Sequence, residues 1–346
     1  MSKNKKFKIY VLVVACLLII IAAALGIRYW NDHKSPNFTR TYTLFVTPQM
    51  TVQQLLDSLE TGAGVKNITS LQRCFDELGV QQSLQPGKYL IKPQHTSIYV
   101  ARMLVNKWTT PHNLTFSGTI RSKEVLARKI ASQMMVDSET VIQALNSEEF
   151  LSAYGFTPEN VFAMILPDTY QVQWDDSVEE IFSRMKKEYD KFWTDERLEK
   201  ASALRLTPSE VSILASIVNG ETNKGFEYPK IAGVYLNRYK KGMKLQADPT
   251  VAFCFDYKLD RVLKKHLAVD SPYNTYKYAG LPPAPINVPP KACIDAVLNP
   301  DSHGYIYFCA SPDFDGTHRF AVTYGDHMKN ARAFQRELTK RQKASK

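Results

Sequence analysis

The chain has 346 residues, of which 44% are hydrophobic and 23% are charged, with 15 Gly and 18 Pro. This is the composition of an ordinary globular protein of about two domains, and it excludes a small disulfide scaffold, a collagen and a wholly disordered chain. The formal net charge of +10 lies at the two ends, because residues 1–40 and 329–346 each carry +6 and the segment between them carries −2. No basic groove for a nucleic-acid backbone is implied, and we expect no nucleic-acid partner.

The first expected element is a transmembrane helix over residues 9–27, which carry no charge. Nineteen helical residues nearly cross a hydrocarbon core of about 30 Å. A cleaved signal peptide is the main alternative, with an A-x-A-like site at Ala22–Ala24, but the apolar run is longer than such peptides usually have. Four lysines precede the run and only Arg28 follows closely, so the positive-inside rule predicts a cytoplasmic tail at 1–8 and an extracytoplasmic remainder.

A small α+β module is expected at residues 43–112, after a polar linker at 28–42. Hydrophobic spacing predicts a strand at 43–46, helices at 51–60 and 71–78, a strand at 88–91 and a helix at 97–105. The order strand, helix, helix, strand recurs in glycan-binding LysM-type modules. The order alone is weak evidence, since many small domains share it.

The rest of the chain, residues 113–346, predicts a larger α+β domain. We expect a strand at 113–116, helices at 122–135 and 138–145, and a long amphipathic helical stretch at 177–204. The four cysteines beyond the apolar run match no zinc or C-x-x-C spacing, so we expect no metal site and interpret them as small buried thiols: Cys74, Cys254, Cys293 and Cys309.

The most informative helix is expected to begin at Thr207. Thr207 followed by Pro208 and Glu210 is a capping-box signature with Pro at the first helical position. The apolar positions that follow continue, at helical spacing, onto Glu221. A carboxyl on that face would be partly desolvated and hold its proton near neutral pH, as a general acid must. Spacing alone leaves open that the helix ends earlier and Glu221 is solvated.

Two later segments, 231–251 and 271–290, hold polar side chains among apolar residues and prolines. Rigid backbone beside aromatic and amide groups suits a sugar-binding cleft, where sugar rings stack on aromatic faces. A stiff loop without function is the alternative. The candidate substrate-binding residues come from these segments, except for two that lie outside them, Thr222 and His318. They are Thr222, Asn237, Gln246, Asp248, Thr250, Tyr273, Asn274, Tyr276 and His318.

These segments resemble a known family over nearly the whole chain. The runs that carry the resemblance are PGKYLI from Pro86, ILPDTY from Ile165, ASIVNGETNKGFEYPKIAGVYLNRYKKGMKLQADPTV from Ala215, DSPYNTYKYAGLPPAPINVPPKACIDAVLNP from Asp270, and YIYFCA from Tyr305. Their sequence and order are similar to those of the endolytic murein transglycosylases, the MltG or YceG-like family.

The resemblance implies an enzyme of the cytoplasmic (inner) membrane with its catalytic domain, 113–346, in the periplasm. Such an enzyme cuts nascent peptidoglycan within the strand, between N-acetylmuramic acid (MurNAc) and N-acetylglucosamine (GlcNAc). The family's catalytic Glu lies in an E-T pair, here Glu221 and Thr222. Glu221 would act as acid on the bridging oxygen and then as base on the muramoyl C6 hydroxyl, which leaves 1,6-anhydroMurNAc ends. No cofactor or metal is expected, and peptidoglycan synthases are the implied protein partners.

Two positions depart from the family's pattern. An acidic residue often stands two positions before the catalytic Glu, where this chain has Asn219, and a Gly of the Pro-rich motif is Ala284 here. We expect the methyl of Ala284 to narrow the cleft slightly. Asp248 and Asp168 are the candidates for a second carboxylate, Asp248 being the first to examine. We expect structural or substrate-orienting roles for both, with Asp168 in a turn or cap.

Two rival functions remain at this stage. A hydrolytic muramidase needs a second carboxylate and leaves reducing ends rather than anhydro ends. A non-catalytic, membrane-tethered peptidoglycan-binding scaffold would use the LysM-like module alone and would lose nothing on substitution of Glu221.

Overall fold

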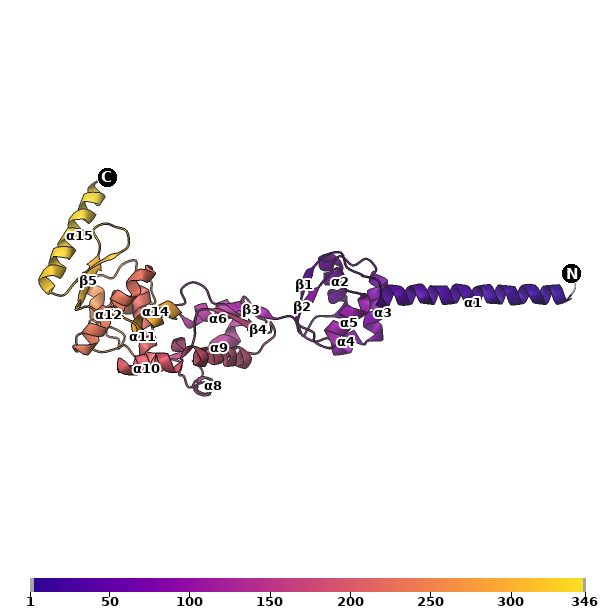
Figure 1. Cartoon of the computed structure of the whole chain (residues 1–346), viewed down its shortest axis with the longest axis horizontal. Helices are drawn as coiled ribbons and strands as arrows, with labels where there is room; N and C mark the ends of the chain where they lie inside the picture. The colour runs from indigo at the N-terminus through magenta and orange to yellow at the C-terminus, as the bar shows by residue number, and fades with distance from the viewer. Residues whose placement is uncertain (1–2, 345–346) are drawn as a thin grey trace. The chain divides into compact units, whose positions relative to one another are not determined.

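The computed structural model describes residues 3–344 and divides by internal contacts into two units. One unit ends at Asn113 and includes Gln171–Asp176, and the other comprises Leu114–Tyr170 and the chain from Ser177 onward. Both mix helices with short strands, as expected for an α+β protein (Figure 1). The three small sheets have two strands each, so helices build most of the structure.

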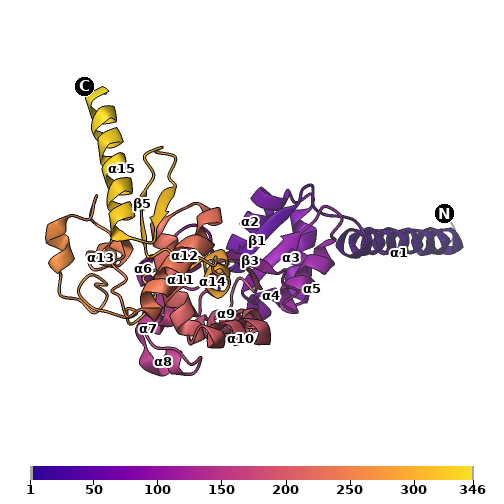
Figure 2. The same cartoon turned by 60° about the vertical axis from the view of Figure 1, so that its left-hand side comes forward.

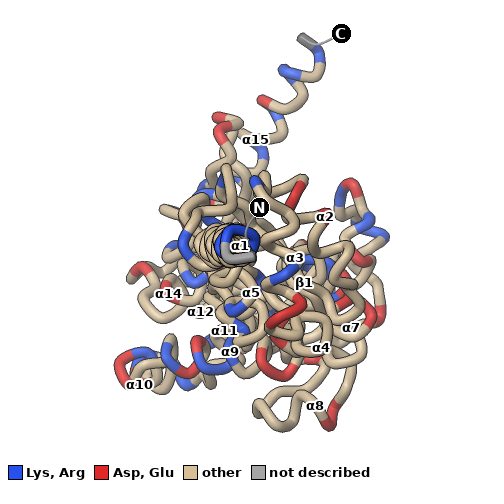
Figure 3. The backbone as a smooth tube through the Cα atoms, turned by 90° about the vertical axis from the view of Figure 1, so that its right-hand side faces the viewer, with Lys and Arg blue, Asp and Glu red and all other residues tan. Residues whose placement is uncertain are grey.

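Helix α1 (Lys3–His33) is long and apolar enough to cross a membrane, and no residue of its most apolar 18-residue window is buried. It extends beyond the expected span, 9–27, at both ends. Figure 3 shows Lys and Arg gathered at the start of α1. These features are consistent with a single-pass membrane protein.

The first unit is built around an antiparallel strand pair, in which Tyr42 pairs with Ile91 and Val46 with Gly87. Side chains from the strands and helices form one buried core that includes Leu44, Leu55 and Tyr89. The elements after α1 are β1 (Tyr42–Val46), α2 (Val52–Ala63), α3 (Ile68–Glu77), α4 (Val80–Ser83), β2 (Gly87–Ile91) and α5 (Ser97–Val105). Capping threonines begin α2 and α5, since Thr51 and Thr96 accept backbone N–H groups there.

The segment expected to be a linker, 28–42, is instead part of the first unit's fold. Residues 28–33 complete α1, where Asp32 pairs with Arg73 at 2.6 Å. Asn37 is buried and donates from Nδ2 to Ser97 Oγ at 2.8 Å, and Phe38 is 1% exposed. Polar composition predicted a solvated tether because it does not reveal that these polar groups are bonded inside the unit.

The chain crosses between the units in β3 (His112–Thr115) and β4 (Thr169–Val172), which pair in a two-stranded sheet. Between and after them lie α6 (Lys123–Ala131), α7 (Ser138–Asn146), α8 (Glu148–Ser152), η1 (Val161–Ala163), α9 (Val178–Phe192) and α10 (Asp195–Ala203). The single stretch expected at 177–204 is thus two helices. Trp193 is buried at the break, and Thr194 caps α10 by accepting the N–H of Arg197.

The core of the second unit lies among α11 (Pro208–Glu221), α12 (Tyr228–Lys240) and α14 (Lys291–Leu298), which contact one another (Figure 2). Around them lie η2 (Gly225–Glu227), α13 (Asp248–Phe253), η3 (Lys264–Ala268), β5 (Tyr307–Ala310), β6 (His318–Ala321) and α15 (Tyr324–Ala344). Strands β5 and β6 form an antiparallel hairpin that packs on α15. This arrangement places the end of α11 and the hairpin around one cavity.

Candidate active site

Helix α11 carries Glu221 as its last residue. Thr207 and Glu210 form the expected capping box, and Pro208 stands in the first turn. Every residue from Val211 to Val218 is buried, so the helix runs through the core. Glu221 keeps partial exposure where the helix reaches the surface. The expected continuation of the buried face onto Glu221 therefore agrees with the helix bounds.

Tyr235 of α12 donates a hydrogen bond from its hydroxyl to Glu221 Oε1 at 2.5 Å. Burial raises the pKa of Glu221 to about 7, the bond from Tyr235 lowers it, the charge of Asp248 raises it and that of Arg238 lowers it. Arg238 is itself buried, with its guanidinium bonded to the carbonyls of Leu245 and Ile306. Glu221 is thus a carboxyl that carries its proton for part of the time at neutral pH, as a general acid requires.

Asp248 is brought to the same site by a close approach between α11 and α13. A Cβ on Gly220 would lie 2.5 Å from Pro249 Cβ, so only glycine fits at this position. Pro249 follows Asp248 in the first turn of α13. Tyr276 donates its hydroxyl to Asp248 Oδ1 at 2.6 Å and so fixes the orientation of the carboxylate.

Glu221 and Asp248 lie between two cavities and line both of them. The cavity of about 220 Å³ is also lined by Gln246, Tyr276 and His318. The other cavity, of about 290 Å³, extends from the same two carboxyls toward residues 257–262. Polar groups on both sides of an acid suit a polymer that passes through the site, because a strand needs binding space on both sides of the bond to be cut.

A buried hydrogen-bond network supports His318 at the cavity. Glu227 is 4% exposed and accepts from the backbone N–H of His318 at 2.9 Å, while its other oxygen lies 2.9 Å from His318 Nδ1. Thr222 donates its hydroxyl to the same carboxylate at 3.3 Å. The network links the residue after Glu221 to β6 and holds the His318 ring in place.

Three of the expected binding residues are turned into the protein. Thr250 and Asn274 are completely buried, and the hydroxyl of Thr250 bonds Thr275 and the Ala247 carbonyl. Asn274 donates to the carbonyls of Leu267 and Val269. Asn237 donates to the carbonyls of His303 and Tyr305, which fixes the chain before β5. Their positions favour support of the loops around the site over contact with a substrate.

Tyr273 lies at a separate cavity described below, beside Phe253. Asn219 lines the 290 Å³ cavity and donates to Asn287 Oδ1 at 2.9 Å, so an amide occupies the place of the family's second acid. Ala284 is fully buried, which corrects the expectation that its methyl narrows the cleft. Asp168 accepts the N–H of Thr169, in keeping with a turn, and pairs with Lys291.

Sequence reasoning missed Tyr235, Arg238 and Glu227 as site residues. Tyr235 stands fourteen positions after Glu221, and its apolar neighbours on α12 gave it the pattern of an ordinary core position. Glu227 is buried in η2 beside the exposed Phe226, and its sequence context gave no signal of that burial. Among the described residues, no group of three or more His, Cys, Asp or Glu is arranged to hold a metal ion.

The chain is similar to known proteins. The model of the YceG-like family matches residues 44–333. A Bacillus subtilis protein named endolytic murein transglycosylase is 32% identical over 219 residues, which is 59% of this chain and 60% of that protein. Proteins of the same name from two Streptococcus pneumoniae strains are 26% identical over 204 residues, 58% of this chain and 36% of theirs. The chain thus spans only part of the length of these relatives.

The fold has a counterpart among solved structures. The crystal structure of a yceG-like protein from Listeria monocytogenes superposes with a TM-score of 0.56 and 24% identity, and the match covers 84% of this chain and 98% of that one. At this identity the likeness concerns the fold. Because the family model matches most of the sequence, the chain belongs to the YceG-like family.

Proposed function

We propose that the protein is a membrane-anchored endolytic lytic transglycosylase that cuts peptidoglycan strands between MurNAc and GlcNAc. The observation that carries the proposal is Glu221, whose pKa lies near 7 at the junction of two cavities. The names of the relatives support the same reaction class and substrate.

The reaction would use Glu221 twice. In the first step its carboxylic acid gives a proton to the bridging oxygen as the bond from MurNAc C1 to that oxygen breaks, which releases GlcNAc with a free hydroxyl. In the second step the carboxylate takes the proton of the muramoyl C6 hydroxyl as O6 bonds to C1. The products are a 1,6-anhydroMurNAc end and a regenerated acid, and no water is consumed.

Asp248 would stabilise the positive charge that develops at C1, since it shares both cavities with Glu221. The same placement favours one alternative, a hydrolytic muramidase in which Asp248 is the nucleophile or activates water. The two reactions differ in product, because hydrolysis leaves reducing ends.

The test is mass spectrometry of products from the full-length protein in detergent, incubated with uncross-linked glycan strands. We expect anhydromuramoyl ends, and we expect Glu221→Gln to abolish them. The matched control is Glu210→Gln on the same helix, where glutamine also completes a capping box. Reducing ends would establish the muramidase instead, and intact strands that still bind both proteins would support the scaffold.

The first unit is proposed to be a LysM-like module that holds the glycan strand. Its antiparallel strand pair encloses helices in the chain order typical of such modules. Binding of glycan strands to a Glu221→Gln protein, with and without deletion of α2 through β2, tests this role. Undiminished binding by the deletion variant would contradict it.

Helix α1 is proposed to span the inner membrane with its lysine-rich start in the cytoplasm, which places both units in the periplasm. Protease added to intact spheroplasts is then expected to digest both units. Peptidoglycan synthases are the proposed protein partners, because strands are accessible to an endolytic enzyme while they are being made. Co-purification of a synthase with the full-length protein tests this partnership.

A further inference from the structure

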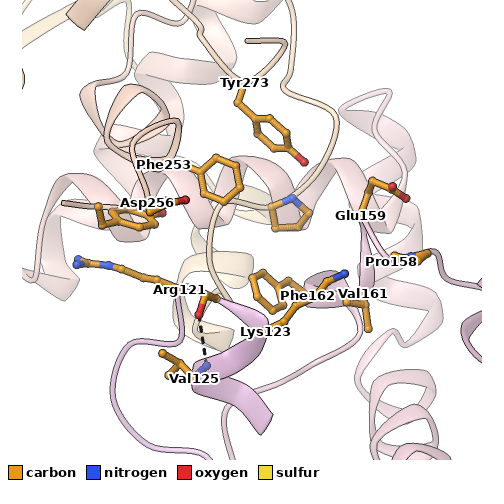
Figure 4. A pocket seen from close by; sticks show the side chains of 13 residues that line it. Arg121, Lys123, Val125, Pro158, Glu159, Val161, Phe162, Phe253, Asp256 and Tyr273 are labelled. Atoms are coloured by element: carbon orange, nitrogen blue, oxygen red, sulfur yellow. Dashed lines mark hydrogen bonds between the residues drawn. The ribbon is translucent and has the colours of Figure 1, made fainter. Parts of the chain in front are cut away.

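A third cavity, of about 490 Å³, lies in the second unit beside the two that meet at Glu221. Its walls come from the start of α6, from the segment before η1, from the end of α13 and from the Pro-rich loop (Figure 4). Its size is that of a small-ligand site. None of the reaction steps above uses it.

The interior of this cavity is apolar. Figure 4 shows the rings of Phe162, Phe253 and Tyr273 around one space. The rings of Phe253 and Tyr273 pack together with centroids 4.5 Å apart, and Pro285 lies between the walls. These surfaces would bind small aliphatic groups such as methyls by removing them from water.

Four charged residues line the cavity: Arg121, Asp256, Lys123 and Glu159, and the last two lie close enough for their charges to interact. Arg121 is exposed and lies over the Tyr257 ring at 4.6 Å, and it forms no ion pair within the described residues. Lys123 bonds Asn146 Oδ1 at 2.7 Å, and Glu159 is exposed on another wall. Figure 4 shows Arg121 and Glu159 on opposite sides of the cavity. A matching ligand carries a carboxylate and an amine joined by apolar groups.

The cavity adjoins the cleft at Glu221. Arg121 and Tyr257 line both this cavity and the 290 Å³ cavity that Glu221 lines. A group attached to a sugar near Glu221 could therefore pass Arg121 and enter the apolar space. In peptidoglycan that group is the peptide that is amide-linked to the lactyl carboxyl of the muramoyl residue, and it carries alanine methyls, carboxylates and the free amine of a diamino acid.

We propose that this cavity binds the stem peptide of the muramoyl residue. Arg121 contacts one of its carboxylates, Glu159 contacts its amine, and the rings of Phe162, Phe253 and Tyr273 contact its methyls. The proposal rests on the proposed function, and it makes the enzyme selective for strands whose peptides are still attached.

The test compares kcat/KM of the full-length protein on two substrates: strands with peptides, and the same strands stripped of peptides by an amidase. We expect kcat/KM to be at least tenfold higher on the peptide-bearing strands, since a hydrogen bond to a charged group commonly strengthens binding about tenfold or more. Glu159→Gln is expected to reduce the preference severalfold while cleavage of stripped strands stays unchanged.

Two further variants complete the comparison. Arg121→Gln is also expected to reduce the preference. Taking the ratio of kcat/KM on the two substrates cancels any effect of Arg121 on binding of the glycan itself. Glu148→Gln, an exposed carboxylate of α8 outside the cavity, is the matched control and should keep the wild-type ratio. Equal kcat/KM on both substrates, or an unchanged ratio in Glu159→Gln, overturns the proposal.

The peptide site can be judged separately from the reaction. If the protein cuts neither substrate, the proposed function fails, and calorimetric titration of the free stem tripeptide decides on the cavity. Binding that Glu159→Gln weakens about tenfold supports the peptide site. Absent binding, or equal binding by both proteins, overturns it.

Discussion

At the residue scale, the acidity of Glu221 depends on one hydroxyl, because Tyr235 donates to its Oε1 at 2.5 Å. That bond favours the ionised carboxylate, so Tyr235→Phe should raise the pKa of Glu221 above its value of about 7. A hydrogen bond to a charged group contributes about 1.5–3 kcal/mol, or roughly one to two pKa units. We expect the alkaline limb of the kcat/KM profile to move to higher pH by that amount.

Tyr239→Phe is the matched control for this shift, since Tyr239 lies on the same helix and is outside both cavities at Glu221. Its pH profile should coincide with that of the wild type. An alkaline limb of Tyr235→Phe that stays in place, or moves to lower pH, would show that the bond does not set the acidity of Glu221.

The raised pKa of Glu221 also has a consequence for stability. Its pKa is 4.5 in an unfolded chain and about 7 in the fold, so its stabilising contribution is complete below pH 4.5 and is lost as the pH rises through 7. Glutamine does not titrate and is spared this loss. The free energy of unfolding of Glu221→Gln, relative to that of the wild type, should therefore rise by up to roughly 3 kcal/mol between pH 5 and pH 8. Hydrogen exchange of α11 at pH 5 and pH 8 measures the opening free energy of both proteins. A difference between variant and wild type that is the same at both pH values would contradict the prediction.

The catalytic candidate could be predicted from the sequence, whereas much of its surroundings could not. Capping signals and helical spacing, which are local properties of the chain, indicated a helix that carries Glu221, and the resemblance of its E-T pair to the family singled it out as the catalytic candidate. Tyr235 and Glu227 act through contacts that depend on how α12 and β6 pack, and no local pattern encodes these contacts. Thr250 and Asn274 were predicted to bind substrate from their place in polar motifs. Both are instead hydrogen-bonded within the protein, where they support the loops around the site.

At the element scale, the approach of α13 to α11 determines where Asp248 lies. Gly220→Ala would place a Cβ 2.5 Å from Pro249 Cβ, and rigid proline cannot move aside as a flexible side chain can. The start of α13 must then shift with Asp248. Because a displacement of about 1 Å can lower a rate by about 100-fold, we expect kcat/KM to fall between tenfold and 100-fold.

Gly304→Ala provides the control, because the nearest atom to its new Cβ, Val322 Cγ2, lies 3.8 Å away. That variant should retain wild-type cleavage. If Gly220→Ala keeps the wild-type kcat/KM, then α13 can shift without displacing Asp248. The close approach of α13 to α11 would then not be required for the reaction.

Elements with strong local signals agree with their expected bounds, and the disagreements have physical causes. Helix α5 and strand β1 lie at or within one residue of the expected bounds because their apolar spacing is regular. The stretch 177–204 breaks into α9 and α10 because a threonine such as Thr194 is more stable as an N-cap than inside a helix. Burial of Trp193 fixes the bend between the two helices. Charge and amphipathicity on both sides of the break are continuous, so periodicity alone does not reveal it.

At the scale of the whole molecule, the described residues show no free tether between α1 and the rest of the first unit. The hydroxyl of Ser70 donates to the carbonyl of Asn31, and Asp32 is 5% exposed beside Arg73. The end of α1 is therefore part of the unit that follows it. These contacts restrain motion of the first unit relative to α1, whereas a polar linker would have left it free.

This continuity determines where the membrane segment can be removed. A protein that begins at Arg28 keeps Asp32, Asn37 and Phe38, and we expect its first unit to retain wild-type stability without detergent. A protein that begins at Thr41 loses all three, including a phenylalanine that is 1% exposed. Loss of a buried phenylalanine side chain costs about 3–5 kcal/mol, so this shorter protein should have a first unit at least that much less stable.

Hydrogen exchange of peptides from β1 and β2 reports the opening free energy of the first unit in both truncated proteins. Peptides from α11 in the second unit provide an internal control, because neither truncation removes any residue of that unit. Equal protection of β1 and β2 in the two proteins would show that residues 28–40 are a dispensable tether after all. A selective loss of protection in the shorter protein would establish that the end of α1 and the rest of the first unit fold as one body.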